Sequence, residues 1–265
     1  MKRLLVVGDS DIAYWPEELL PSPSENDSVE GETEWNPPLV SGHSGATLAG
    51  VIPHLQSILL ESRSNSFGDG GGGNDTRTRT PHGERDDDVL LVVACAGEND
   101  IGEGLSLGKS VEALRDFVDA IFLGNESGDD RYLVFLGPKF EPWLEHDPSY
   151  KKKYEAMARA FRRCLDEYET ATIADSDHTT NSTNGNSSTA SSVGSNRSGG
   201  RVRFIDCLTM FCGETANLPG ARLGGRARAD PRFFRSDQLH LSKEGYKVWK
   251  EVVETTIRDF LPLSK

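Results

Sequence analysis

The chain has 265 residues, of which 36% are hydrophobic, and a formal net charge of −13 at pH 7. This length suits one α/β domain, and the acidic charge is unfavourable for binding nucleic acid or an anionic membrane surface, since phosphate groups are bound by clustered Lys and Arg. No apolar run approaches the ~18 residues that span a bilayer and no signal sequence is seen, so we expect a cytoplasmic protein without nucleic-acid or membrane partners.

Short runs rich in Val and Leu alternate along the chain with longer segments of helical period, which is typical of parallel strands joined by crossover helices. Strands are predicted at residues 3–7, 89–95, 132–136 and 202–206, with a weaker strand near 38–41. Helices are predicted at 46–61 and 149–169, and in two segments whose apolar residues recur every three or four positions, within 111–122 and 246–260. Pro53 should start or kink the first of these helices.

Three segments lack the apolar residues needed for a core. Residues 16–38 hold seven acidic residues and no Lys or Arg, residues 63–88 include a Gly-rich run, and residues 172–200 are mostly Ser, Thr, Asn, Gly and Asp. Such compositions bury too little apolar area to offset the entropy of ordering the chain. We therefore predict a single domain over residues 1–265, with an acidic loop at 16–38 and disordered insertions at 63–88 and 172–200.

The residues that follow each predicted strand are the first place to look for chemistry, because ligands of parallel sheets bind beyond the carboxyl ends of the strands. The first strand ends in Gly8, Asp9 and Ser10. A Ser at a tight turn between strand and helix can present its hydroxyl outward, with its own N–H facing the same space. The alternative is that Ser10 caps the following helix beside a turn glycine.

Two further segments could supply hydrogen-bond donors to an anion. Gly45 lies in Ser44-Gly45-Ala46-Thr47, a small-residue turn whose backbone N–H groups can face an anion, although an ordinary Gly-rich turn is the alternative. The neighbouring His43 is expected to be a loop residue and not a catalytic base. After the strand at 89–95, the side-chain amide of Asn99 can donate to a developing oxyanion, or can form a local turn or helix cap.

Near the C-terminus, Asp237 and His240 stand three residues apart just before the last predicted helix. An Asp at this spacing can accept a hydrogen bond from one imidazole nitrogen and leave the other nitrogen free to take a proton from a serine. Taken alone, this pattern is also common at the solvated start of a helix. Its value lies in its combination with the other three segments.

Together, the four segments supply a nucleophile (Ser10), a base (His240), an orienting carboxylate (Asp237) and three oxyanion donors (Ser10, Gly45 and Asn99). The set resembles the SGNH (GDSL-like) hydrolase family in order and spacing, through Gly8-Asp9-Ser10, Ser44-Gly45-Ala46-Thr47, Gly97-Glu98-Asn99-Asp100 and Asp237-Gln238-Leu239-His240. The resemblance implies a three-layer α/β/α sandwich with a flavodoxin-like five-stranded parallel sheet, and ester hydrolysis without a metal or cofactor. Asp11 departs from the family, which usually has an apolar residue after the serine.

The function predicted on these grounds is that of a serine esterase acting on a small-molecule or carbohydrate ester, with a short acyl chain because no long apolar lid is visible. A non-catalytic binding protein on the same scaffold is the main alternative. A flavodoxin-like nucleotide or phosphate binder is a second one, but the chain lacks the GxGxxG and GxxxxGK[ST] sequences and such a binder does not explain the Asp237–His240 pair.

Three more residues near the predicted site have open roles. Lys139 and Trp143 follow the fourth strand, and could line the site or lie over exposed surface. Arg235 belongs to an arginine-rich stretch, residues 222–235, and lies two positions before Asp237. It could pair with the acidic loop at 16–38 in solvent, or reach the pocket rim and hold an anionic group of the substrate.

Overall fold

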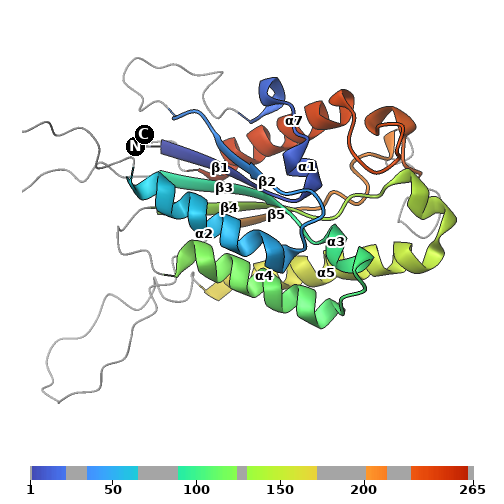
Figure 1. Cartoon of the computed structure of the whole chain (residues 1–265), viewed down its shortest axis with the longest axis horizontal. Helices are drawn as coiled ribbons and strands as arrows, with labels where there is room; N and C mark the ends of the chain where they lie inside the picture. The colour runs from blue at the N-terminus through green and yellow to red at the C-terminus, as the bar shows by residue number, and fades with distance from the viewer. Residues whose placement is uncertain are drawn as a thin grey trace, which may run out of the picture.

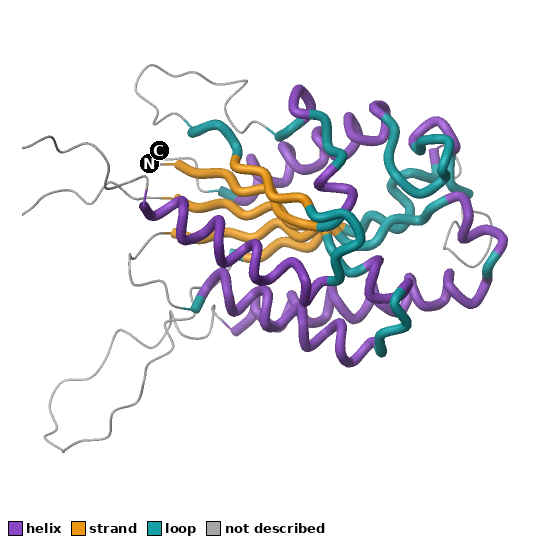
Figure 2. The backbone as a smooth tube through the Cα atoms, viewed as in Figure 1, coloured by secondary structure: helices purple, strands orange, loops and turns teal. Residues whose placement is uncertain are grey.

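The computed structural model describes residues 2–21, 35–64, 89–123, 130–171, 201–213 and 228–261. It shows a parallel sheet with helices on both faces (Figures 1 and 2). The strands are β1 (Lys2–Gly8), β2 (Leu39–Gly42), β3 (Val89–Cys95), β4 (Asp130–Leu136) and β5 (Val202–Ile205). The α-helices are α1 (Ser10–Ala13), α2 (Leu48–Ser64), α3 (Glu98–Gly102), α4 (Leu107–Phe122), α5 (Pro148–Ala171) and α7 (Lys243–Phe260), and the 3₁₀ turns are η1 (Glu17–Leu19), η2 (Pro142–His146) and η4 (Pro231–Phe233).

The strand order is β2-β1-β3-β4-β5, and all neighbouring strands are parallel. This is the flavodoxin-like order, so the predicted three-layer fold and five-stranded sheet are confirmed. The three central strands, β1, β3 and β4, are buried along almost their whole length, which explains why each reads as a continuous apolar run instead of an alternating one. Each predicted strand lies within two residues of the observed one.

Helices α2, α4 and α5 cover one face of the sheet, while α1 and α7 lie on the other (Figure 1). The apolar periodicity of the last helix is confirmed, since α7 buries Tyr246, Trp249, Val253, Ile257 and Phe260. Helix α4 likewise buries one face, as expected of an amphipathic helix on a sheet. Among the described residues, none of the helices combines the length and apolar character needed to cross a membrane.

The prediction that residues 16–38 contribute nothing to the core is wrong at both ends of that segment. Leu19 is buried in the hydrophobic core, and its carbonyl accepts a hydrogen bond of 2.7 Å from Nε1 of Trp15. Trp35 packs against the same core. Leu19 and Trp35 therefore contribute to the core from the two ends of the segment, while residues 22–34 lie outside the described part of the chain.

Two smaller predictions also change. Pro53 lies inside α2 and does not start it, and α2 continues to Ser64, into the segment predicted as an insertion. The rest of that insertion, residues 65–88, and the insertion at 172–200 lie outside the described residues.

Candidate active site

The turn that follows β1 places Ser10 at the carboxyl edge of the sheet. A Cβ on Gly8 would lie 2.0 Å from the carbonyl oxygen of Cys95, so the close approach of β1 to β3 requires glycine at this position. Asp9 then caps α1, because its carboxylate accepts a hydrogen bond of 3.1 Å from the backbone N–H of Asp11. The alternative that Ser10 is the helix cap is therefore wrong, and Ser10 is the first residue of the helix.

Ser10 lines a pocket of about 140 Å³. The pocket brings Ser10 together with Asn99 and with Leu239, the neighbour of His240. Its other lining residues are Asp9, Glu98, Gly102, Lys139, Trp143, Tyr150 and Tyr154. Lys139 and Trp143, whose positions the sequence left open, thus belong to the pocket, whereas Gly45 is absent from this set of described lining residues.

Asp237 and His240 form the hydrogen bond that their spacing suggests. Oδ2 of Asp237 lies 2.9 Å from Nδ1 of His240, and Oδ1 accepts the backbone N–H groups of Leu239 and His240 at 2.9 and 3.0 Å. Although partial burial opposes the effect, these hydrogen bonds lower the pKa of Asp237 to about 2. An ionised acceptor on Nδ1 holds the ring proton there and leaves Nε2 as the basic nitrogen.

The Asp237–His240 pair is not the start of a helix, which was its alternative interpretation. Helix α7 begins at Lys243, and its cap is Ser242, whose side chain accepts the N–H of Gly245. The pair lies instead in the loop before the helix. The side chain of His240 is 17% exposed, so its ring is partly shielded from solvent.

The loop of His240 packs directly on the turn that carries Ser10. The Tyr14 ring, at the end of α1, meets the His240 ring edge-on with 4.7 Å between centroids. The Tyr246 hydroxyl of α7 donates a hydrogen bond of 2.8 Å to the carbonyl of Asp11. In the described part of the chain the Ser10 hydroxyl forms no hydrogen bond, and contacts between nucleophile and base often tighten only when substrate binds.

Among the described residues, Arg235 contacts nothing in the 16–38 segment and does not line the Ser10 pocket. Its guanidinium stacks on the Tyr14 ring at 4.9 Å, and Nε donates to the carbonyl of Leu241 at 3.1 Å. It lines a separate pocket of about 370 Å³ beside the Ser10 pocket. In the described part of the acidic segment, Glu18 accepts a hydrogen bond of 2.9 Å from Lys243. Arg235 therefore braces the end of α1 against the His240 loop.

Asn99 connects the turn after β3 to the turn after β2. Its amide Nδ2 donates to the carbonyl of Ala46 at 3.0 Å, in the turn where Gly45 has the left-handed φ of 77° that favours glycine. The cap of α3 is Gly97 and not Asn99, so the alternative of a helix cap is wrong. A primary amide has two N–H donors, and one remains for a ligand in the pocket.

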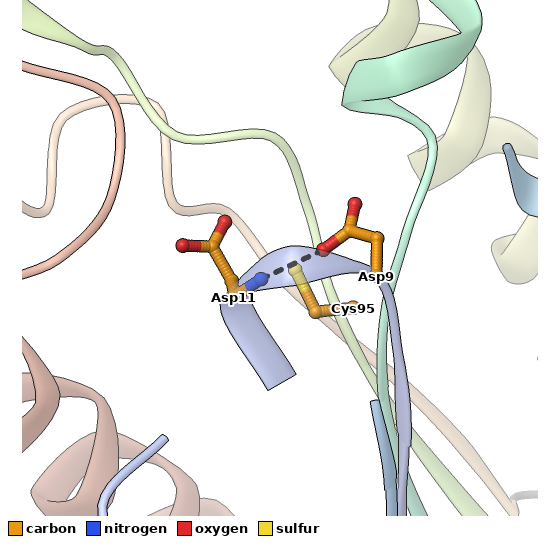
Figure 3. A group of neighbouring side chains, drawn as sticks. All are labelled: Asp9, Asp11 and Cys95. Carbon is orange, nitrogen blue, oxygen red and sulfur yellow. Dashed lines mark hydrogen bonds between the residues drawn. The ribbon is translucent and has the colours of Figure 1, made fainter. Parts of the chain in front are cut away.

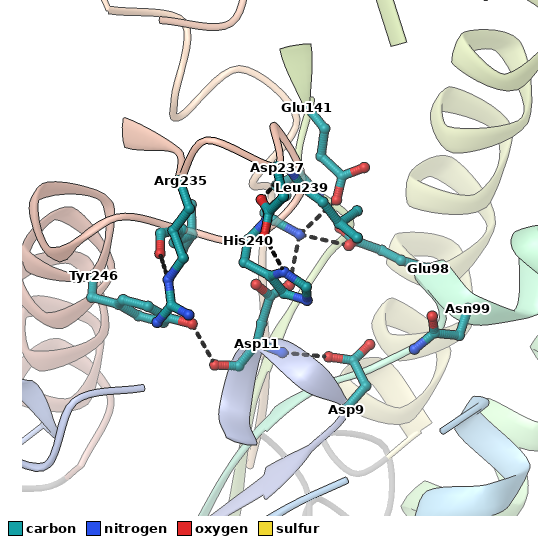
Figure 4. A network of polar contacts seen from close by, with 12 residues as sticks. Asp9, Asp11, Glu98, Asn99, Glu141, Arg235, Asp237, Leu239, His240 and Tyr246 are labelled. Atoms are coloured by element: carbon teal, nitrogen blue, oxygen red, sulfur yellow. Dashed lines mark hydrogen bonds and ion pairs between the residues drawn. The ribbon is translucent and has the colours of Figure 1, made fainter. Parts of the chain in front are cut away.

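A buried ionic cluster lies beneath the pocket, and sequence reasoning missed it. The Lys139 ammonium contacts Oδ2 of Asp11 at 2.6 Å, Oε2 of Glu98 at 2.7 Å and Oε1 of Glu141 at 2.8 Å. These three acids are labelled in Figure 4. The Lys139 side chain is 1% exposed, whereas the sequence allowed an exposed loop lysine. The sequence feature that could have pointed to this cluster is Asp11, which follows the serine where an apolar residue is usual. A buried carboxylate at that position needs a cationic partner.

Asp9, Asp11 and Cys95 form a second group, which shares Asp11 with this cluster (Figure 3). One carboxylate oxygen of each Asp and Sγ of Cys95 lie within 4.8 Å of one another. Burial, with smaller contributions from Asp9 and Asp11, raises the pKa of the Cys95 thiol. Burial and the nearby Asp11 and Glu98 also raise the pKa of Asp9. Burial therefore disfavours the ionised thiolate and carboxylate that a metal ion would need from these residues.

The raised pKa of Asp9 predicts a pH-dependent stability difference for Asp9→Asn. The pKa of Asp9 is higher in the folded protein than in the unfolded chain. The stability that the protonated Asp9 carboxyl contributes is therefore full at low pH and is lost as pH rises. Asn matches the protonated acid and does not ionise. We expect the Tm of Asp9→Asn relative to the natural chain to be roughly 2 to 4 °C higher at about pH 8 than at about pH 4. A calorimetric difference that is the same at both pH values would contradict this.

The comparisons with known proteins find no matching family model and no matching curated protein. Solved structures do match. A lipase/acylhydrolase from Enterococcus faecalis is 14% identical over 100% of both chains, with a TM-score of 0.53. A carbohydrate esterase family 3 from Talaromyces cellulolyticus is 14% identical over 98% of this chain and 97% of its own, with a TM-score of 0.51. A carbohydrate acetylesterase from Sinorhizobium meliloti is 12% identical over 98% of this chain and 100% of its own, with a TM-score of 0.51.

At these identities the similarity establishes the fold alone, and any activity has to be argued from the residues of this chain. The chain has the α/β/α fold of the SGNH (GDSL-like) hydrolases. The sheet edge that carries the motifs in this chain is also the edge at which parallel sheets bind their ligands.

Proposed function

We propose that the protein is a serine esterase that hydrolyses short-chain carboxylic esters of small alcohols or carbohydrates. The observation that carries the proposal is the pairing of Asp237 with Nδ1 of His240, in a loop packed on the turn of Ser10. This arrangement supplies a base with a fixed ring and a serine at the start of a helix. Solved structures of acylhydrolases and acetylesterases with the same fold support it.

In the first half of the proposed reaction, Nε2 of His240 takes the proton of the Ser10 hydroxyl while Oγ attacks the ester carbonyl carbon. The carbonyl oxygen becomes an oxyanion, which the N–H groups of Ser10 and Gly45 and the amide of Asn99 would stabilise. Collapse of this intermediate breaks the bond to the alcohol oxygen, which takes the proton from His240. Asp237 keeps the imidazolium oriented throughout.

In the second half, His240 takes a proton from water, and the resulting nucleophile attacks the acyl group on Ser10. A second oxyanion forms and collapses, which releases the carboxylic acid and returns the proton to Ser10. The ester and one water molecule are the only reactants that the two halves consume. The domain proposed for this chemistry is the single one over residues 1–265.

The size and walls of the pocket favour a short acyl group. About 140 Å³ holds an acetyl or propionyl group but not a long chain. One wall is aromatic, because the Trp143 ring packs against Tyr150 and Tyr154 with 5.4 and 6.3 Å between centroids. Flat aromatic surfaces suit the apolar face of a sugar as well as a small acyl group.

The test is labelling by a fluorophosphonate together with a series of nitrophenyl esters from acetate to palmitate. We expect the label on Ser10, and kcat/KM to be highest for acetate and to fall at least ~10-fold by octanoate as the chain outgrows the pocket. Absence of both labelling and turnover would overturn the proposal and favour a binding protein on the same scaffold. Labelling with a preference for long chains would keep the esterase and reject the substrate class.

The place of Arg235 predicts a small and unselective effect for Arg235→Ala. The guanidinium braces Tyr14, which contacts His240, and it lies outside the Ser10 pocket. We expect kcat/KM to fall roughly three- to tenfold, equally for a neutral ester and for one that carries a carboxylate. A loss confined to the charged ester, and weakened by salt, would show instead that Arg235 binds an anionic substrate group.

A further inference from the structure

The Lys139 cluster joins the two segments that carry the proposed reaction. Asp11 directly follows Ser10 in α1, and Glu98 directly precedes Asn99 in α3, and both carboxylates contact the Lys139 ammonium. Glu98 is held twice, because its Oε1 also accepts the backbone N–H of Lys139 at 2.7 Å. One side chain therefore fixes the position of the serine turn relative to the asparagine turn.

The third partner connects the cluster to the pocket wall. Glu141 is fully buried, and its second oxygen accepts hydrogen bonds from the indole N–H of Trp143 and from the Tyr154 hydroxyl. Both of these residues line the Ser10 pocket. The ammonium thus lies at the junction of three segments, each of which contributes residues to the pocket.

Charge is the second feature of the cluster. The carboxyl groups of Asp11, Glu98 and Glu141 contact one ammonium group, and a fourth, that of Asp9, interacts with it electrostatically. The four acids are labelled in Figure 4. The other titratable groups that interact electrostatically with the cluster include Cys95, Cys207, Tyr154, Tyr246 and His240. An oxyanion that forms in the pocket would lie over this excess of acids, so the cation beneath it offsets a repulsion that would otherwise oppose the reaction.

Burial affects how the net charge of the Lys139 cluster depends on pH. Burial is the largest cause that raises the pKa of Asp9, Asp11 and Glu141. Although burial acts in the opposite direction on Lys139, the carboxylates of Asp11, Glu141 and Glu98 raise its pKa and keep it charged. With rising pH the acids lose their protons while the cation stays, so the compensation becomes more important as pH rises.

We propose that Lys139 is a positioning residue of the active site, which holds the Ser10 and Asn99 turns in register and offsets the negative charge beneath the oxyanion hole. The role in turnover rests on the proposed esterase function. The role in holding the two turns does not. The two can therefore be tested by separate measurements on the same variants.

The experiment compares Lys139→Met with Arg131→Met. Arg131 is also a buried cation, but it lies at the opposite end of β4, where it donates to the carbonyl of Ile121. Both variants lose a buried positive charge, so both are expected to lower Tm, and only the first lies beneath the pocket. The measurements are backbone hydrogen exchange over residues 10–13 and 98–102, and kcat and KM for nitrophenyl acetate from about pH 5 to about pH 9.

For Lys139→Met we expect faster exchange in both segments and a kcat at least ~10²-fold below that of the natural chain near neutral pH, with KM changed less. The loss should deepen as pH rises, because buried acids without a cation become charged. Arg131→Met should show neither effect. Lys139→Arg, which keeps the charge in a larger group, should lose less than ~10-fold and equally at all pH values.

Exchange in the two segments that matches Arg131→Met would overturn the positioning role, whether or not the protein hydrolyses esters. A loss of kcat that does not depend on pH would overturn the electrostatic role. If Lys139→Met does not fold, Lys139→Arg decides by the same exchange comparison: faster exchange in both segments than in Arg131→Met supports the positioning role, and equal exchange overturns it. Absence of turnover in the natural chain would reject the esterase function, and the exchange rates alone would then decide whether Lys139 holds the two turns.

Discussion

Replacing Ser10 with Ala is expected to lower kcat for nitrophenyl acetate at least ~10³-fold, and His240→Ala should cost a similar factor. The proposed reaction loses its nucleophile in one case and its proton acceptor in the other. Stability should change little for Ser10→Ala, because the hydroxyl is not hydrogen-bonded within the described residues and Ser10 lines a pocket. Circular dichroism and Tm check that both variants fold, and steady-state kinetics give the effect.

His43→Ala is the matched control for His240→Ala. His43 lies near the same rim, beside Gly45, but its ring stacks on His54 and bonds with Ser41. Burial, with the neighbouring His54, lowers the pKa of His43, and no carboxylate orients its ring among the described residues. We expect its loss to change kcat less than ~3-fold. Full activity in Ser10→Ala, or equal losses in the two histidine variants, would refute the assigned nucleophile and base.

The parts of the fold that local sequence determines could be predicted. Strands β1, β3 and β4 are short apolar runs because both faces are buried, and helix α7 shows its apolar face every three or four residues. The four motifs follow strands or precede the last helix, so parallel topology alone brings them to one edge. The Asp237–His240 bond could also be predicted, since it joins residues three positions apart in one turn.

The parts that depend on distant residues could not. Lys139 and Asp11 are separated by 128 positions, and nothing in the local sequence of either shows that it is buried with the other. Arg235 looked like a candidate for binding an anion, yet its partners, Tyr14 and Leu241, are defined by how the His240 loop folds over α1. Gly45 was assigned as an oxyanion donor from its motif. It is not among the lining residues of the Ser10 pocket, and its position depends on a turn geometry that sequence spacing does not specify.

The dependence of the oxyanion hole on tertiary contacts makes Asn99→Ala the most informative change after those of the nucleophile and base. We expect kcat for nitrophenyl acetate to fall roughly 10²- to 10³-fold with KM nearly unchanged, because the amide would bind the oxyanion more strongly than the ground-state carbonyl. The same change removes the hydrogen bond to Ala46. The variant therefore tests a donor role and a bracing role at once.

Hydrogen exchange over residues 45–48 separates the two roles of Asn99. The turn has its own support, since Oδ1 of Asp100 accepts the N–H of Leu48 at 2.8 Å and the carbonyl of His43 accepts the N–H of Ala46 at 3.1 Å. We therefore expect exchange there to rise little while kcat falls, which marks Asn99 as an oxyanion donor. A large rise in exchange with the same loss of kcat would make it a brace for the Gly45 turn. Unchanged kcat would remove Asn99 from the oxyanion hole, because a donor to the developing charge cannot be lost without a slower chemical step.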